Sequence, residues 1–89
     1  MKIDYTAKFE KKYSELPKQI KVKAEKQEKI FRNNPLHPSL HTEKLSPKFK
    51  EVWTFRVDKN YRVMFKFIGK DTVLFLNIGS HNYIYRINF

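Results

Sequence analysis

The chain has 89 residues, with 19 Lys and Arg against 9 Asp and Glu, and its formal net charge is +10. This length fits a single domain over residues 1–89, and the 40% share of hydrophobic residues argues against disorder. The sequence has no apolar run of the ~18–20 residues that a membrane span needs, and its first residues lack a secretion signal, so we expect a cytoplasmic protein. The lack of cysteine excludes disulfides, thiolate metal sites and Cys nucleophiles. The charge indicates a polyanionic partner, first of all nucleic acid, then an acidic protein or an anionic membrane surface.

The first third of the chain predicts a strand and two helices. Residues 2–5 alternate as in a short strand, and Thr6 is a suitable N-cap for the helix that follows. Pro17 suits the first turn of a second helix, which Asn34-Pro35 ends. Helical spacing assigns inward positions to Phe9, Tyr13 and Leu16 in the first helix and to Ile20, Ala24, Gln27 and Phe31 in the second. Together they predict a helical hairpin with a lysine-rich exterior.

The rest of the chain predicts a polar connection over about residues 33–50 and then strands. Residues 52–57, 61–68 and 72–79 are rich in β-branched and aromatic residues, with turns at residues 58–60 and 69–71. The fold class is therefore α+β: a strand, a helical hairpin and a three-stranded antiparallel meander, with one sheet packed on two helices.

The register of the first hairpin follows from its side chains. A three-residue loop over residues 58–60 pairs Phe55 with Val63 and Trp53 with Phe65, all on the core face. The other face then receives Thr54, Arg56, Arg62, Met64 and Lys66. Arg56 lies directly opposite Arg62, an unfavourable pair unless water, a nearby acid or a bound anion compensates it.

These elements, in this order, resemble the RelE/ParE superfamily of toxins from type II toxin–antitoxin pairs. The resemblance covers nearly the whole chain and is carried by Leu16-Pro17, by residues 34–40, by residues 43–45, by the hairpin of residues 52–65 and by residues 79–86. It implies the RelE-like fold of the microbial RNase type, with a concave basic sheet face. RelE-like and YoeB-like members cleave mRNA in the ribosomal A site, whereas ParE-like members poison DNA gyrase. It also implies an acidic antitoxin that wraps the toxin in a hetero-oligomer.

The resemblance supplies the candidate arginines. Arg62 matches the family's strand arginine, and its planar fork suits a phosphate. Arg56 lies where RelE-like members have a basic residue and YoeB-like members an arginine, so it is a candidate second phosphate clamp. Thr54 stands where RelE-like members carry a catalytic lysine, which puts the lysine-based mechanism in doubt.

The resemblance also supplies candidates for proton transfer. His81 matches the tail position that is His in YoeB-like members and Arg in RelE-like members, and histidine is the best acid or base near neutral pH. Tyr83 and Tyr85 follow at alternate positions; one should contact the substrate and the other should belong to the core. Glu43 matches the YoeB-like general base, or else it is a surface carboxylate.

No cofactor and no metal are expected. His37 and His41 are four residues apart, but Pro38 disfavours a helix there, and no further ligands complete a shell. The leading hypothesis is a ribosome-dependent mRNA endonuclease that acts by metal-free acid–base chemistry. The alternatives are a ParE-like gyrase toxin, for which His81 is not required, and an RNA-binding relative that has lost activity.

Overall fold

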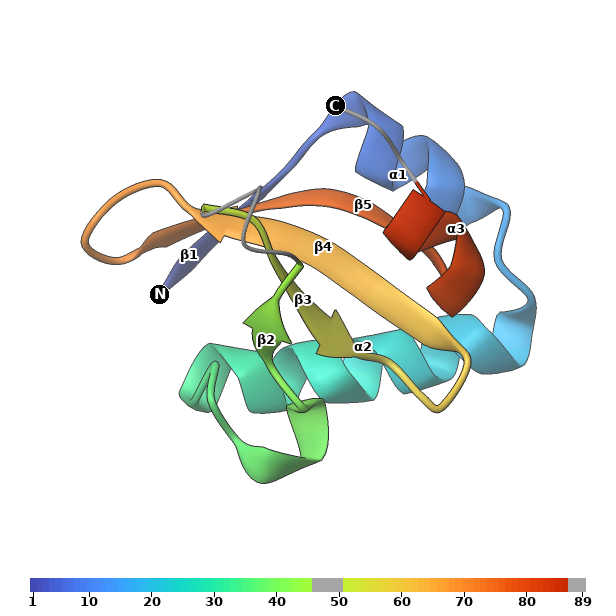
Figure 1. Ribbon diagram of the computed structural model, residues 1–89, viewed down its shortest axis with the longest axis horizontal. Coiled ribbons are helices and arrows are strands. Elements are labelled where there is room, and N and C mark those ends of the chain that lie inside the picture. The colour runs from blue at the N-terminus through green and yellow to red at the C-terminus, as the bar shows by residue number, and fades with distance from the viewer. Residues whose placement is uncertain (46–50, 87–89) are drawn as a thin grey trace.

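The computed structural model describes residues 1–45 and 51–86. They form a five-stranded sheet in the order β1-β5-β4-β3-β2, with helices on both faces (Figure 1). The elements are β1 (Lys2–Tyr5), α1 (Ala7–Ser14), α2 (Lys18–Asn33), the 3₁₀ turn η1 (Pro38–Leu40), β2 (Glu43–Lys44), β3 (Trp53–Arg56), β4 (Tyr61–Phe67), β5 (Thr72–Ser80) and α3 (His81–Arg86). None of the described helices is long and apolar enough to cross a membrane.

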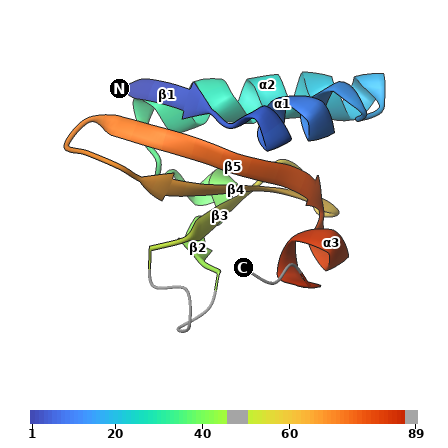
Figure 2. The ribbon, with the colours of Figure 1, turned by 90° about the horizontal axis from the view of Figure 1, so that it is seen from above.

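The two predicted helices cover one face of the sheet, and α3 lies on the opposite face (Figure 2). α1 begins after Thr6, whose side-chain oxygen accepts a hydrogen bond from the Phe9 backbone N–H, as predicted for an N-cap. Pro17 is the residue just before the first turn of α2. The helical hairpin and the α+β class that the sequence predicts are thus confirmed.

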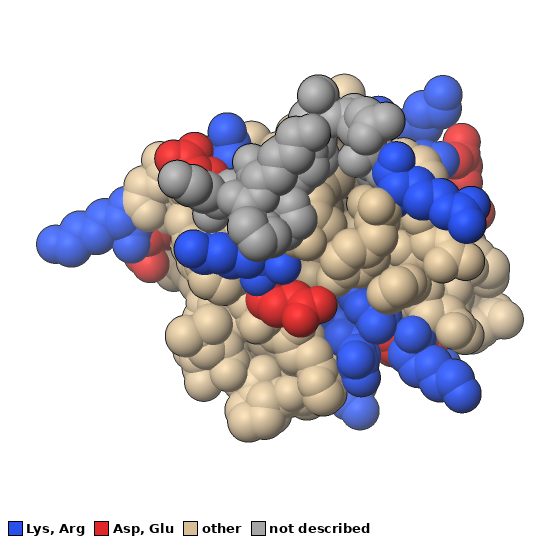
Figure 3. Space-filling model, in the orientation of Figure 1, with Lys and Arg blue, Asp and Glu red and all other residues tan. Residues whose placement is uncertain are grey.

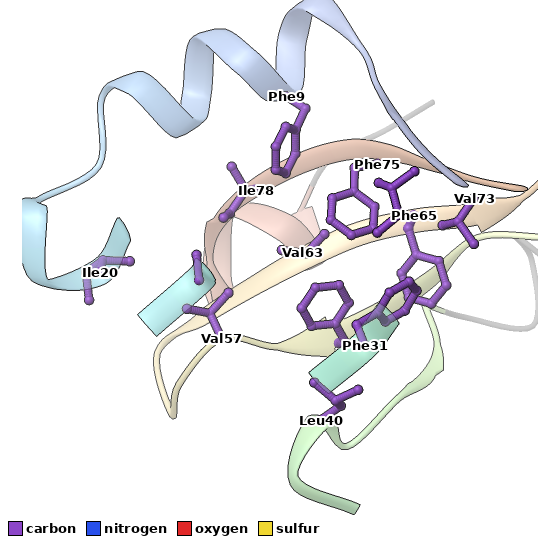
Figure 4. Close-up of a cluster of buried hydrophobic side chains, with 13 residues drawn as sticks. Phe9, Ile20, Phe31, Leu40, Val57, Val63, Phe65, Val73, Phe75 and Ile78 are labelled. Atoms are coloured by element: carbon purple, nitrogen blue, oxygen red, sulfur yellow. The ribbon is translucent and has the colours of Figure 1, made fainter. Parts of the chain in front are cut away.

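An aromatic core fills the space between the hairpin and the sheet (Figure 4). Phe31 of α2 is fully buried, and its ring lies 4.9 Å from that of Phe55, 5.0 Å from that of Phe65 and 5.5 Å from that of Phe75. Rings of this size remove a large apolar area from water and prefer tilted and edge-to-face contacts at these distances. Phe31 therefore fixes the helical hairpin against the sheet.

The predicted register of the β3–β4 hairpin is confirmed. Phe55 pairs with Val63, Trp53 pairs with Phe65, and Arg56 pairs with Arg62. The turn over residues 58–60 closes as expected, because the Val57 N–H donates to the Tyr61 carbonyl. The alternation of apolar and polar residues was sufficient to place both arginines on the face that α3 shares.

Two pairings were not predicted. β1 runs parallel to β5, so the beginning of the chain is an edge strand beside Thr72–Phe75. The connection after α2 is not wholly irregular, because it contains η1 and β2, and Glu43 of β2 pairs with Thr54. Residues 46–50 of that connection lie outside the described residues. A two-residue strand has no periodic pattern, which is why the sequence did not reveal it.

The second sheet face is less open than predicted. Residues 81–86, expected as the tail of the last strand, form the helix α3 instead. Ile84 of α3 packs on Met64 and Leu45, and all three are buried. Met64 was expected on the open basic face, but it is 1% exposed. The helix forms because this contact buries apolar surface that a strand continuing past Ser80 would leave in water.

Candidate functional site

The arginine pair forms the floor of the candidate site. Arg56 ends β3 and Arg62 lies near the start of β4, directly opposite each other. One terminal nitrogen of Arg62, Nη1, donates to the backbone carbonyls of Asp58 at 2.7 Å, Tyr61 at 3.0 Å and Lys59 at 3.3 Å. The turn therefore holds the guanidinium from one side and fixes its orientation.

Burial makes this pair electrostatically costly. Arg62 is only 8% exposed, and burial followed by the facing charge of Arg56 lowers the pKa of the Arg62 guanidinium. The Tyr85 phenol and the carboxylates of Glu43 and Asp58 act in the opposite direction and raise the pKa of Arg62. Nε of Arg56 is buried and has no hydrogen-bond partner among the described residues. An anion bound between the two guanidinium groups would relieve their repulsion.

The β3–β4 turn that supports Arg62 is itself held by Asp58. Oδ1 of Asp58 accepts hydrogen bonds from the backbone N–H groups of Asn60 at 2.8 Å and Tyr61 at 2.9 Å. Its Oδ2 lies 3.4 Å from the Lys23 ammonium of α2. Partial burial raises the pKa of Asp58, but these three contacts outweigh it, and the pKa is lowered overall.

α3 places His81 and Tyr85 on one side of a helix. The two residues are four positions apart, and their ring centroids lie 4.6 Å apart. The backbone N–H of His81 donates to the carbonyl of Asn60 at 2.7 Å, which ties the start of α3 to the turn that holds Arg62. The His81 side chain is exposed, so the imidazole is accessible at the mouth of the site.

Tyr85 connects α3 to the strands beneath it. Its hydroxyl donates to Oε1 of Glu43 at 2.9 Å and lies 3.2 Å from the hydroxyl of Thr54. Burial, followed by the bond to Glu43 and its charge, raises the pKa of Tyr85, while Thr54 and Arg62 act against the rise. Thr54 is 1% exposed, and its hydroxyl anchors that of Tyr85. It is the residue that stands where RelE-like members carry a lysine.

Tyr83 lies apart from this group. Two positions along a helix differ by about 200°, so Tyr83 and Tyr85 face opposite sides of α3. The Tyr83 hydroxyl accepts from Nδ2 of Asn77, and the Lys12 ammonium of α1 lies 4.4 Å from its ring centroid. The structure thus brings together Arg56, Arg62, His81, Tyr85 and Glu43 but places Tyr83 against α1 and β5.

A surface pocket opens beside the arginine floor. Its lining consists of Lys59, Asn60, Arg62, Ser80, His81 and Asn82. Four of these residues, Lys59, Asn60, Ser80 and Asn82, were not singled out from the sequence. Their only signal was their place, since Lys59 and Asn60 belong to a turn and Ser80 and Asn82 flank His81. Lys and Arg side chains are more extensive than acidic ones on the face that includes α3 (Figure 3).

The chemistry of this arrangement combines fixed cations with proton-handling groups. Two guanidinium groups suit a phosphate, and an exposed imidazole and a carboxylate suit proton transfer near neutral pH. Among residues 1–45 and 51–86, no three His, Asp or Glu side chains gather in a way that could hold a metal ion. The arrangement could therefore bind a phosphodiester and move protons on either side of it.

Residues 3–81 match the family described as the RelE-like toxin of the type II toxin–antitoxin system HigB. No curated protein sequence matches the chain. Several solved structures share the fold. A YoeB/ParE toxin from Agrobacterium tumefaciens is 15% identical, with a TM-score of 0.76 over 91% of this chain and 99% of that one. YafQ from E. coli strain BL21(DE3) is 20% identical, with a TM-score of 0.76 over 93% and 96% of the two chains.

A third similar structure contains an antitoxin. It is the RelB–RelE antitoxin–toxin complex from Methanococcus jannaschii, 19% identical to this chain, with a TM-score of 0.72 over 92% of this chain and 94% of that one. At these identities the structures establish the shared fold, whereas the match over residues 3–81 concerns the family.

Proposed function

This chain belongs to the RelE-like toxins of type II toxin–antitoxin systems, and on that premise we propose that it is an endoribonuclease that cuts mRNA on the ribosome. The observation that carries the proposal is the facing pair Arg56 and Arg62, with a buried Nε that lacks a partner among the described residues. Such a pair is unfavourable in a plain structural role and favourable beside a phosphate. The exposed His81 beside it supplies an acid or base that a purely binding role does not need.

The proposed reaction is metal-free transesterification. The ribose 2′-OH loses its proton and attacks the adjacent phosphorus, and the bond to the 5′ oxygen breaks, which leaves a 2′,3′-cyclic phosphate and a 5′-OH. Arg62 and Arg56 hold the phosphate and stabilise the charge that develops on its oxygens. Glu43, oriented by Tyr85, accepts the 2′-OH proton, and His81 donates a proton to the departing oxygen. The His81 ring packs against the tilted ring of Tyr85, so Tyr85 orients both groups.

The proposed partner is an acidic antitoxin. Charge supports it, because a chain of net +10 favours a partner of opposite sign. The RelB–RelE assembly shows that a protein of this fold is held by an antitoxin. A neighbouring reading frame for a short, acidic, partly helical protein is the expected genetic context, and its absence would weaken the proposal.

Ribosome-dependent cleavage tests the proposal directly. Purified protein should cut mRNA in a translating extract and leave the same naked mRNA intact. Arg62→Ala and His81→Ala should each lower the cleavage rate by about 10²-fold or more, the size expected for a lost charge-stabilising or proton-transfer group. Primer extension on the mRNA would locate and quantify the cuts.

Matched substitutions control for charge and fold. Arg32→Gln removes an arginine that pairs with Glu28 on α2, and His41→Asn removes a histidine at a left-handed position that asparagine tolerates. Both variants should cut like the unchanged protein. Intact mRNA on actively translating ribosomes loaded with the folded protein would refute the nuclease. Defects in supercoiling with unaffected translation would select the gyrase toxin instead.

A further inference from the structure

Gly79 is the residue of β5 on which the ring of Tyr83 rests. A Cβ atom at Gly79 would lie 2.5 Å from Cδ2 of Tyr83, 3.1 Å from Cε2 and 3.4 Å from Cγ. No glycine in the described part of the chain has a positive φ, so the backbone conformation does not require glycine here. The Tyr83 ring above Gly79 is what excludes a side chain, and the atoms in conflict lie along one edge of that ring.

Two further contacts hold the Tyr83 ring in this position, and a separate hydrogen bond orients one of its partners. Its hydroxyl accepts a 3.0 Å hydrogen bond from Nδ2 of Asn77, a side chain that is 2% exposed. Oδ1 of Asn77 accepts from the Ile78 backbone N–H, which orients the amide so that its NH₂ group faces the hydroxyl. The Lys12 ammonium lies 4.4 Å from the ring centroid, a favourable cation–π distance. Gly79 therefore lies beneath the Tyr83 ring, Asn77 holds its hydroxyl, and Lys12 contacts the ring from α1.

The same short helix carries the site residues on its other side. Tyr83 faces β5 and α1. Tyr85 faces Glu43 and Thr54 instead, and the His81 ring packs against that of Tyr85. A shift of Tyr83 away from Gly79 moves the helix as a unit, because adjacent turns share backbone hydrogen bonds. The position of the two site residues over the arginine pair thus depends on a contact made on the opposite side of α3.

From this geometry we infer that Gly79, Asn77 and Tyr83 are positioning residues, which seat α3 on β5 and thereby set His81 and Tyr85 over Arg56 and Arg62. The kinetic part of this inference rests on the proposed function. It gives Tyr83 a role at a distance from the substrate, whereas the sequence left open which of Tyr83 and Tyr85 would contact the substrate.

Gly79→Ala tests the inference with a minimal change. A misplacement of about 1 Å can cost about 10²-fold in rate, so kcat for ribosome-dependent cleavage should fall by about 10²-fold while KM changes little. Gly69→Ala is the matched control, because a Cβ there meets only Thr72 Cβ at 3.9 Å, and it should cut like the unchanged protein. In a Tyr83→Ala background, which has already lost the ring, adding Gly79→Ala should have little further effect.

The phenol of Tyr85 provides a readout that does not depend on cleavage. With ¹³C-labelled tyrosine, and Tyr85 assigned by its loss in Tyr85→Phe, NMR titration follows the Tyr85 pKa, which burial and Glu43 raise in the seated helix. The groups that face this phenol are Glu43, Arg62, Thr54 and His81. In Gly79→Ala the Tyr85 pKa should fall toward the ordinary value for tyrosine, and in Gly69→Ala it should not.

Tyr83→Phe distinguishes positioning from a substrate contact and keeps the test open if Gly79→Ala does not fold. This variant keeps the ring on Gly79 and should lose much less activity than Tyr83→Ala. Equal losses in Tyr83→Phe and Tyr83→Ala, with the Tyr85 titration unchanged in both, would overturn the inference, as would full activity in Gly79→Ala. If the unchanged protein cuts no mRNA, the proposed function fails, and the Tyr85 titration still decides the positioning role.

Discussion

Asp58 illustrates how a single turn residue supports the site. Its carboxylate holds the β3–β4 turn through the Asn60 and Tyr61 N–H groups, and its own carbonyl accepts the shortest hydrogen bond from Arg62. The carboxylate also faces Lys23, which belongs to α2 on the far side of the sheet. The orientation of a site arginine therefore depends on a residue that contacts no substrate in the proposed reaction.

Asp58→Asn should destabilise the protein in a pH-dependent way. The pKa of Asp58 is lower in the folded protein than in the unfolded chain. The charged carboxylate therefore stabilises the folded state at any pH above the unfolded-state pKa of about 3.9. This contribution is lost as the pH falls through the folded-state pKa. At pH 7 the variant should lose about 1 kcal/mol of unfolding free energy, and near pH 3 the difference should shrink. Urea denaturation at both pH values measures it. Asp71→Asn, at an exposed carboxylate, is the control, and an Asp58→Asn difference that is equal at both pH values would contradict this account.

Only the part of the candidate site that depends on local sequence pattern could be predicted. The facing of Arg56 and Arg62 followed from the alternation in two strands and the length of one turn. The bond from Tyr85 to Glu43 could not be predicted, because it needs both the unpredicted strand β2 and the unpredicted helix α3. Different environments for Tyr83 and Tyr85 were expected, but which of the two lies beside Glu43 could not be predicted, because their directions are set by the unpredicted helix α3.

At the scale of elements, Thr6 joins α1 to an irregular point of β5. Met64 of β4 pairs with Asn77 and Phe65 pairs with Phe75, so Leu76 is an extra residue on β5. The Thr6 hydroxyl donates to the Leu76 carbonyl at 2.9 Å while it caps the Phe9 N–H at 3.0 Å. A side chain that caps a helix therefore also satisfies the carbonyl of the bulged residue.

Thr6→Val should lower the unfolding free energy by about 2 kcal/mol, because it keeps the branched shape but loses the helix cap and the bond to Leu76 together. Thr6→Ser retains the hydroxyl and should cost much less. Thermal or urea unfolding of the three proteins compares them. A loss in Thr6→Val no larger than that in Thr6→Ser would contradict the role assigned to the two hydrogen bonds, because only the Val variant lacks the hydroxyl.

Some elements are determined by their own sequence pattern and others are not. The long helix α2 and the strands β3, β4 and β5 carry clear periodicity, and their existence and type were predicted correctly. α3 contains His, Asn, Tyr and Ile, none of which favours a helix, and its form depends on the contacts of Ile84 and Tyr83 with distant strands. Tertiary contact outweighed local propensity there.

At the scale of the whole molecule, two groups of positive charge lie on opposite faces of the sheet. One is the arginine floor on the face shared with α3. The other is the lysines of α2, a helix that lies on the opposite face of the sheet (Figure 2). Lys18, Lys26 and Lys29 of α2 are exposed. Because α2 and the arginine pair lie on opposite faces of the sheet, we expect these three lysines to contribute to association and not to the chemical step.

The triple variant Lys18→Gln, Lys26→Gln and Lys29→Gln should therefore leave kcat unchanged and weaken association at low salt. For every phosphate that one of these lysines neutralises, its removal should reduce the slope of log affinity against log salt by up to about 0.9. Ribosome binding and cleavage measured between 50 and 200 mM salt, in the range where such slopes are large, separate the two effects. A fall in kcat at saturating ribosomes would show that this face takes part in catalysis.

The parallel pairing of β1 with β5 has a consequence for the order in which the protein can assemble. Lys2 pairs with Thr72 and the Thr6 hydroxyl reaches Leu76, contacts that span about 70 residues of chain. Contacts this distant in sequence form late, because the long intervening loop must close first. During synthesis the first strand has no neighbour until β5 has been made, and α3 follows β5 directly. The residues proposed for catalysis can therefore come together only after β5 and α3 have been translated.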